Sequence, residues 1–74
     1  MWVKLLTTDQ EGKDVFVDSN IDYNKCLAYF IIPLYVDEEL DLTVESDEMC
    51  VFLGGTTIVL KVNQDLIKLI DAKL

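Results

Sequence analysis

The chain has 74 residues, of which 51% are hydrophobic and 27% are charged, and its net charge is −8. This apolar fraction is too high for a disordered tail, and no apolar run reaches the roughly 18 residues that a membrane-spanning helix needs. The sequence contains neither histidine nor arginine, which excludes histidine-based triads and arginine clamps for phosphate. We therefore expect one small domain over residues 1–74, with no catalytic residues, no metal site and no cofactor.

The N-terminal part predicts a hairpin. Trp2–Thr7 has the composition of a strand, Thr8–Gly12 that of a turn, and Asp14–Asp18 that of a second strand. Ser19 and Asn20 indicate a break after it. The first residues lack the apolar core and cleavage site of a signal peptide, so we expect a cytoplasmic protein.

The middle of the chain is ambiguous between strand and helix over residues 21–36. Tyr29–Val36 is rich in aromatic and β-branched residues, which favours a strand. Pro33 has no backbone donor, so this strand must lie at a sheet edge or be interrupted there. Further on, Leu40, Leu42 and Val44 alternate with polar residues, which predicts a half-buried strand with an acidic outer face.

The C-terminal part predicts a second hairpin and a helix. Met49–Leu53 and Thr56–Val62 flank Gly54-Gly55, a pair suited to a two-residue turn with positive φ. Asn63 caps a closing helix, with Asp65 near its positive end and Lys73 near its negative end. The helix places four apolar residues on one face, namely Leu66, Ile67, Ile70 and Leu74.

These elements predict an α+β fold, a mostly antiparallel sheet of four to six strands with one C-terminal helix. With Leu53 opposite Thr56, both faces of the last hairpin are largely apolar. One helix covers only one of these faces, so we expect the chain to form a homo-oligomer. Cys26 and Cys50 lie in apolar stretches without a CxxC pattern, which predicts two buried thiols.

The acidic charge is concentrated in residues 37–50, which hold seven acids and no base. Such a segment would attract a basic protein surface and repel nucleic acid. The alternative interpretation is a solvated edge strand whose charge discourages aggregation. A calcium loop over residues 37–48 fits poorly, because Leu42 occupies the sixth position, where the loop requires glycine. The candidate partner-binding residues are Asp37, Glu38, Glu39, Asp41, Glu45, Asp47 and Glu48, with Tyr29 and Tyr35 supplying contact area.

The segment Val15–Ile21, the Gly54-Gly55 hairpin, the strand Ile58–Val62 and the short terminal helix together resemble the small flagellar-operon proteins of the FlbD/SwrD type. This resemblance covers both ends of the chain and leaves out residues 22–48. It implies an accessory protein and not an enzyme. In composition alone, the chain is also similar to small acidic phage inhibitors of the anti-CRISPR type.

Two functions follow as hypotheses. The first is an acidic protein-binding module, in concrete form a phage or mobile-element inhibitor that occupies the basic surface of a nucleic-acid-binding partner. The second is a small homo-oligomeric accessory or assembly protein, whose acids serve solubility. Ionic strength discriminates between them, because binding steered by acids weakens as salt rises and an apolar contact does not. Neither hypothesis involves a membrane or direct contact with nucleic acid.

Overall fold

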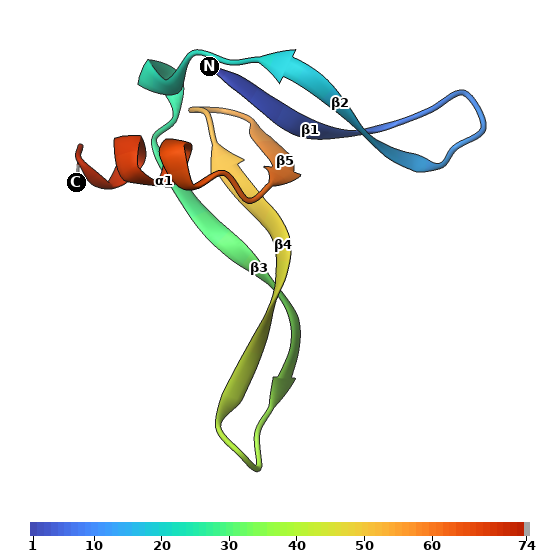
Figure 1. Cartoon of the computed structure of the whole chain (residues 1–74), viewed down its shortest axis with the longest axis vertical. Coiled ribbons are helices and arrows are strands. Elements are labelled where there is room, and N and C mark those ends of the chain that lie inside the picture. Colours follow the sequence, from blue (N-terminus) through green and yellow to red (C-terminus); the bar gives the residue numbers. More distant parts are fainter. Residues whose placement is uncertain (74) are drawn as a thin grey trace.

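The computed structural model describes residues 1–73, which form one five-stranded antiparallel sheet and a C-terminal α-helix (Figure 1). The strand order is β2-β1-β5-β4-β3. This confirms the predicted α+β class. The strands are β1 (Trp2–Thr8), β2 (Asp14–Asn20), β3 (Ala28–Asp37), β4 (Leu42–Phe52) and β5 (Thr57–Lys61); a 3-10 turn η1 (Tyr23–Lys25) precedes β3, and the helix is α1 (Gln64–Asp71).

The predicted N-terminal hairpin is present, and its turn is held by Asp9. The carboxylate of Asp9 accepts from the backbone N–H groups of Glu11 and Lys13 at 2.8 and 2.9 Å. The predicted break at residues 19–20 is wrong, because β2 continues to Asn20. Met1 extends this pairing. Its ammonium donates to Asn20 Oδ1 at 2.7 Å, and its carbonyl accepts from the Ile21 N–H at 2.8 Å.

The ambiguous middle segment contains the edge strand β3, as the composition of Tyr29–Val36 favoured. Pro33 was expected either at a sheet edge or at an interruption of the strand, and the structure shows it at both. β3 pairs only with β4 among the described strands, and its register shifts on either side of Pro33. Opposite this irregularity, the Ser46 hydroxyl donates to the Ile32 carbonyl at 2.6 Å, which satisfies a backbone acceptor that the shifted ladder leaves free.

The two segments predicted around residues 40–45 and 49–53 form one strand, β4, of 11 residues. Val44 is half-buried as expected, but the expected half-burial of Leu40 and Leu42 is wrong. Their exposed fractions are 66% and 54%, and Leu40 lies in the turn before the strand. The reason is that this end of the β3–β4 hairpin extends beyond the part of the sheet that α1 covers (Figure 1).

The second hairpin turn and the helix cap match their predictions. The Leu53 N–H donates to the Thr56 carbonyl at 2.8 Å, and Gly54 has a φ of 76°. Asn63 Oδ1 accepts from the Leu66 N–H at 3.0 Å and so caps α1. Lys73 follows the helix, and its ammonium donates to the carbonyls of residues 23 and 26. The predicted position of Leu74 lies outside the described residues.

The core lies between α1 and one face of the sheet. Its buried side chains are Val3, Cys26, Met49, Val51, Leu60, Leu66 and Ile70. Burial was correctly predicted for Cys26, and it raises the pKa of this thiol, while nearby Lys73 partly offsets the effect. For Cys50 the prediction of burial is wrong, because this side chain is only half-buried on the opposite face. In the part of the chain that the structure describes, both thiols are free.

The sheet is strongly twisted, so its two long hairpins project in different directions from the region of α1 (Figure 1). The molecule measures 40 × 39 × 22 Å along its principal axes. Within residues 1–73, none of the helices has the length and apolar character required to cross a membrane.

Candidate functional site

The end of the β3–β4 hairpin, residues 33–45, forms a projection that we call the arm. Its two strands pair from Pro33 opposite Glu45 to Asp37 opposite Leu42. The register shifts around the proline separate it from the part of the hairpin that packs in the core. Figure 1 shows this hairpin end extending away from α1 and from the N-terminal hairpin. The arm is therefore held by strand pairing alone and is accessible on its sides.

The arm exposes an unusual amount of apolar surface. It holds five of the eleven large hydrophobic residues that are exposed in the described chain. Three of these five are consecutive in β3. Tyr35 and Val36 lie in the regular part of the ladder and so point to opposite faces, which makes both faces of the arm apolar. Isolated exposed hydrophobic residues are normal, whereas a contiguous group marks an interaction surface. The five are Leu34, Tyr35, Val36, Leu40 and Leu42, with exposed fractions between 54% and 67%.

Five predicted acids lie on the arm, and one of them has a structural role. Asp37 Oδ1 accepts from the N–H groups of Glu39 and Leu40 at 3.1 and 3.2 Å, which holds the turn. Asp41 has a φ of 51°, a left-handed conformation that aspartate tolerates better than most residues. Four exposed carboxylates remain for contact with a partner: Glu38, Glu39, Asp41 and Glu45. Since residues 33–45 contain no lysine, this surface is uniformly negative.

The two remaining predicted acids lie closer to the centre of the sheet. Asp47 Oδ2 is 4.0 Å from Lys61 Nζ, and the Asp47 carbonyl accepts from the Val62 N–H at 2.7 Å. Glu48 pairs opposite Lys61 in the β4–β5 ladder. Both acids therefore face a lysine of the same chain, unlike the carboxylates of the arm.

The two predicted tyrosines are separated by the structure. Tyr35 lies on the arm, 56% exposed and opposite Val44. Tyr29 lies at the other end of β3, partly buried against the core, and its hydroxyl donates to Asp71 Oδ1 at 3.0 Å. This hydrogen bond to a carboxylate raises the pKa of the Tyr29 hydroxyl. Only Tyr35 adjoins the acids of the arm.

Sequence reasoning missed the apolar half of the arm, namely Leu34, Val36, Leu40 and Leu42. Alternation of apolar and polar residues indicates a strand face but does not reveal what covers it. The expected lengths of the helix and of the strand would have revealed that the helix cannot cover the whole hairpin. An eight-residue helix is about 12 Å long and an eleven-residue strand about 36 Å, so α1 covers only part of β4.

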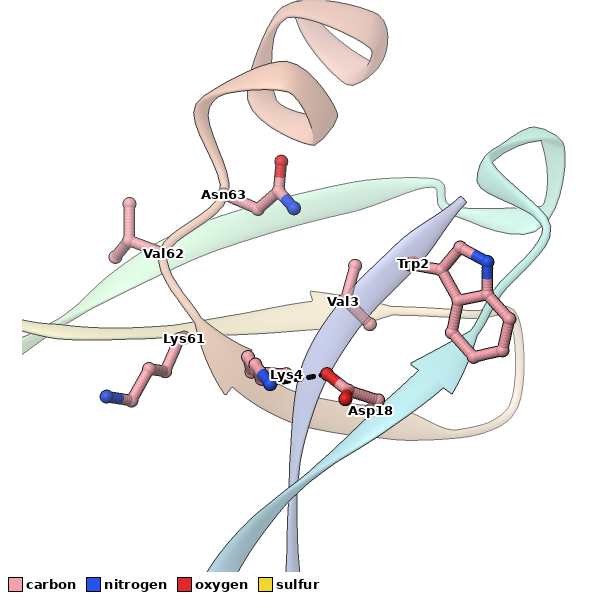
Figure 2. A pocket seen from close by; sticks show the side chains of 7 residues that line it. All are labelled: Trp2, Val3, Lys4, Asp18, Lys61, Val62 and Asn63. Atoms are coloured by element: carbon pink, nitrogen blue, oxygen red, sulfur yellow. Dashed lines mark ion pairs between the residues drawn. The ribbon is translucent and has the colours of Figure 1, made fainter.

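Two hollows lie elsewhere on the surface. The first, of about 130 Å³, lies where the chain leaves β5 for α1 (Figure 2). In it the ammonium of Lys4 and the carboxylate of Asp18 meet at 2.5 Å, while Lys61 points away from this pair. The second, of about 510 Å³, is open and lies between Asp22 and the turn before β5.

Chemistry at a metal is not indicated by the arrangement of the acids. Within residues 1–73, no three cysteine, aspartate or glutamate side chains are grouped so that they could hold a metal ion. Residues 37–48 form the end of one strand, a turn and the start of another, which is not the geometry of a calcium loop between helices.

Comparisons of this chain with protein-family models, with curated proteins and with solved structures found no match. The resemblance to flagellar-operon proteins stays a prediction from the sequence. The candidate site is accordingly defined by the geometry and chemistry of the arm.

Proposed function

We propose that this chain is a non-enzymatic protein-binding module and that the arm is its binding element. The observation that carries the proposal is the coincidence of five exposed large hydrophobic side chains with four free carboxylates on one projecting hairpin. Exposed apolar area of this kind is costly in water unless a partner covers it. The partner would present an apolar surface bordered by basic residues.

The carboxylates and the apolar residues of the arm would contribute to binding in different ways. The carboxylates of Glu38, Glu39, Asp41 and Glu45 would attract a basic surface over a Debye length and raise the association rate. Tyr35 and the neighbouring aliphatic residues would supply contact area and slow dissociation. A second arm is an unsuitable occupant, because it carries the same negative charge.

In its concrete form, the proposal is an inhibitor of a nucleic-acid-binding protein in the cytoplasm. A groove that binds nucleic acid is lined with lysine and arginine and often contains stacking residues. A two-stranded arm with carboxylates along it would compete for such a groove. The comparison with small acidic phage inhibitors, drawn from composition, is compatible with this form.

The test begins with affinity capture from nuclease-treated lysate of the native host and ends with the purified partner. An apolar variant carries Leu34→Ser and Val36→Ser, and an acid variant carries Glu38→Gln, Glu39→Gln and Asp41→Asn. We expect the apolar variant to lose at least about tenfold in affinity, mostly through faster dissociation. We expect the acid variant, which keeps only Glu45 of the four, to associate more slowly and to lose most of the salt dependence measured between about 50 and 300 mM.

A matched control neutralises three acids away from the arm. Glu11→Gln, Asp14→Asn and Asp65→Asn change the net charge as the acid variant does. Equal weakening by the control and the acid variant would show that only net charge matters and would contradict the assignment to the arm. Full binding by both arm variants would also contradict it. Competition between the partner's nucleic acid and this protein would support the inhibitor form.

The second candidate function is a small homo-oligomeric accessory protein. The observation that favours it is the sheet face opposite α1, where Cys50, Phe52 and Val59 keep exposed surface. A self-association through this face would be insensitive to salt, unlike binding through the arm. Solution mass measured across a salt series tests this candidate, and capture with the arm variants tests the first.

A further inference from the structure

The sheet face opposite α1, which we call the open face, has an apolar centre. On β4 the buried residues Met49 and Val51 face the helix, and the alternate residues Cys50 and Phe52 point to the open face. Phe52 is 36% exposed and Phe30, on the same face, is 47% exposed. Their rings pack against each other with centroids 5.9 Å apart. Apolar side chains thus remain accessible on the side that α1 does not reach.

The register of the strands aligns these side chains into one row. Leu6 lies opposite Phe16, Val59 opposite Cys50, and Cys50 opposite Phe30. Leu6 adjoins Val59, because Leu5 pairs with Leu60 and the two strands are antiparallel. The row therefore crosses all five strands without a polar interruption. At about 4.8 Å per strand spacing, it spans about 19 Å.

The charges beside this row nearly cancel, which distinguishes the open face from the acidic arm. The next row on one side holds Asp18, Lys4, Lys61 and Glu48, two acids and two lysines, and the next row on the other side holds one acid, Asp14. Lys4 pairs with Asp18, and the Lys61 ammonium lies 5.2 Å from the centroid of the Phe16 ring (Figure 2 shows the two lysines and Asp18). A second copy of the chain can approach here without the repulsion that its net charge of −8 imposes elsewhere.

We propose that the open face binds the open face of a second copy, giving a face-to-face sheet dimer. Two apolar sheet faces pack about 10 Å apart with interdigitating side chains. A copy of this chain supplies a matching apolar row with nearly balanced charges beside it, which is the chemistry that the open face itself presents. A strongly basic partner would gain little at this face and more at the arm.

The available area fits a reversible dimer. Five strands and about six residues along each give a face of about 500 Å² per copy, below the roughly 800 Å² per partner of standard interfaces. The dimer is therefore concentration-dependent. Each open face binds the other, so neither copy has a free open face that could bind a third copy. The arms project beyond the sheet and remain free. If the proposed function of the arm holds, one dimer presents two arms and gains avidity.

The dimer is tested by sedimentation equilibrium from about 10 µM to 1 mM in reducing buffer, a range that suits an interface of this size. We expect a monomer–dimer transition in the wild type, little changed between low and high salt. Val59→Lys and Phe30→Ser, two changes on different strands, are each expected to weaken dimerisation at least tenfold. Circular dichroism and urea unfolding show that each variant still folds. Leu34→Ser, on the arm, is the matched control and should leave the dimer unchanged.

Cysteine chemistry gives a second readout that does not depend on the variants. Cys50 lies in the middle of the apolar row, and Cys26 is fully buried in the core and serves as an internal reference. We expect the rate at which a thiol reagent modifies Cys50 to fall as protein concentration rises, while Cys26 reacts only after unfolding.

Four outcomes would overturn the proposal. They are a monomer at all concentrations, assemblies larger than a dimer, a dimer that survives both open-face variants, and a dimer lost in Leu34→Ser. The first three do not concern binding of a basic partner, which is measured separately with the arm variants, whereas the fourth would place the arm in the dimer contact. Failure of the dimer and failure of the arm's function are therefore distinguishable.

Discussion

The hydroxyl of Tyr29 donates a hydrogen bond to Asp71 Oδ1 across 3.0 Å, joining edge strand β3 to the last residue of α1. A carboxylate at the C-terminal end of a helix is unfavourable, because the helix dipole is negative there. The donated hydrogen bond offsets this and fixes the helix over the sheet. It also raises the pKa of the tyrosine above its usual value of about 10.

The first prediction concerns the pH dependence of this contact. A raised folded-state pKa means that the hydrogen bond stabilises the fold below pH 10, where the tyrosine is neutral in both states. The stabilisation is lost as pH rises through the folded pKa, and the tyrosinate then repels Asp71. We expect Tyr29→Phe to be less stable than wild type at pH 7 and for this deficit to shrink as pH rises above 10. Urea unfolding of both proteins at the two pH values measures it, and a deficit that is constant with pH would contradict the prediction.

The second prediction concerns the β4–β5 turn. Gly54 has a φ of 76°, whereas the φ of Gly55 lies outside the left-handed region, and open space surrounds the position of an added Cβ at both. Gly54→Ala should therefore lower the free energy of unfolding by about 1–2 kcal/mol through backbone strain alone. Gly55→Ala, the matched control, should be neutral or raise it by up to about 1 kcal/mol, because the unfolded chain loses freedom. Equal effects of the two substitutions in urea unfolding would be inconsistent with the turn.

The third prediction concerns the start of α1. Asn63 Oδ1 accepts from the Leu66 N–H at 3.0 Å, which satisfies one of the free donors of the first turn. We expect Asn63→Ala to cost about 1 kcal/mol of stability and Asn63→Asp to retain most of it, since a carboxylate accepts the same bond. Thermal unfolding followed by circular dichroism compares the three proteins. A loss as large in Asn63→Asp as in Asn63→Ala would mean that the amide group, and not the cap, matters.

Much of the fold could be predicted because its determinants are local. Gly54-Gly55 sets a turn, and the turn sets which β4 residue faces which β5 residue, so the two faces of the last hairpin follow from counting. The cap at Asn63 is equally local. What could not be predicted is the partner of β1. Its pairing with β5 joins the two ends of the chain, and no short-range pattern encodes that choice.

The candidate site was only half predictable for a related reason. The acids of residues 37–48 form a recognisable run of charge. Four of them, Glu38, Glu39, Asp41 and Glu45, are exposed on the arm, as the favourable hydration of carboxylates predicts. The exposure of Leu40 and Leu42 contradicts their alternating pattern, since this pattern reports what a residue could bury and not whether a neighbour is present. The short helix leaves the outer half of the hairpin uncovered.

The last prediction separates the arm from the core by stability. Leu34 and Leu42 are 67% and 54% exposed, so truncating either to alanine removes little buried area and should change the free energy of unfolding by less than about 0.5 kcal/mol. Leu60 is fully buried beneath α1, and Leu60→Ala should cost about 2–5 kcal/mol, enough to unfold much of a domain this small. Urea unfolding at a concentration where the protein is monomeric gives all three values. A large loss in Leu34→Ala would mean that the arm is packed in the monomer, and its apolar surface would then be unavailable to a partner.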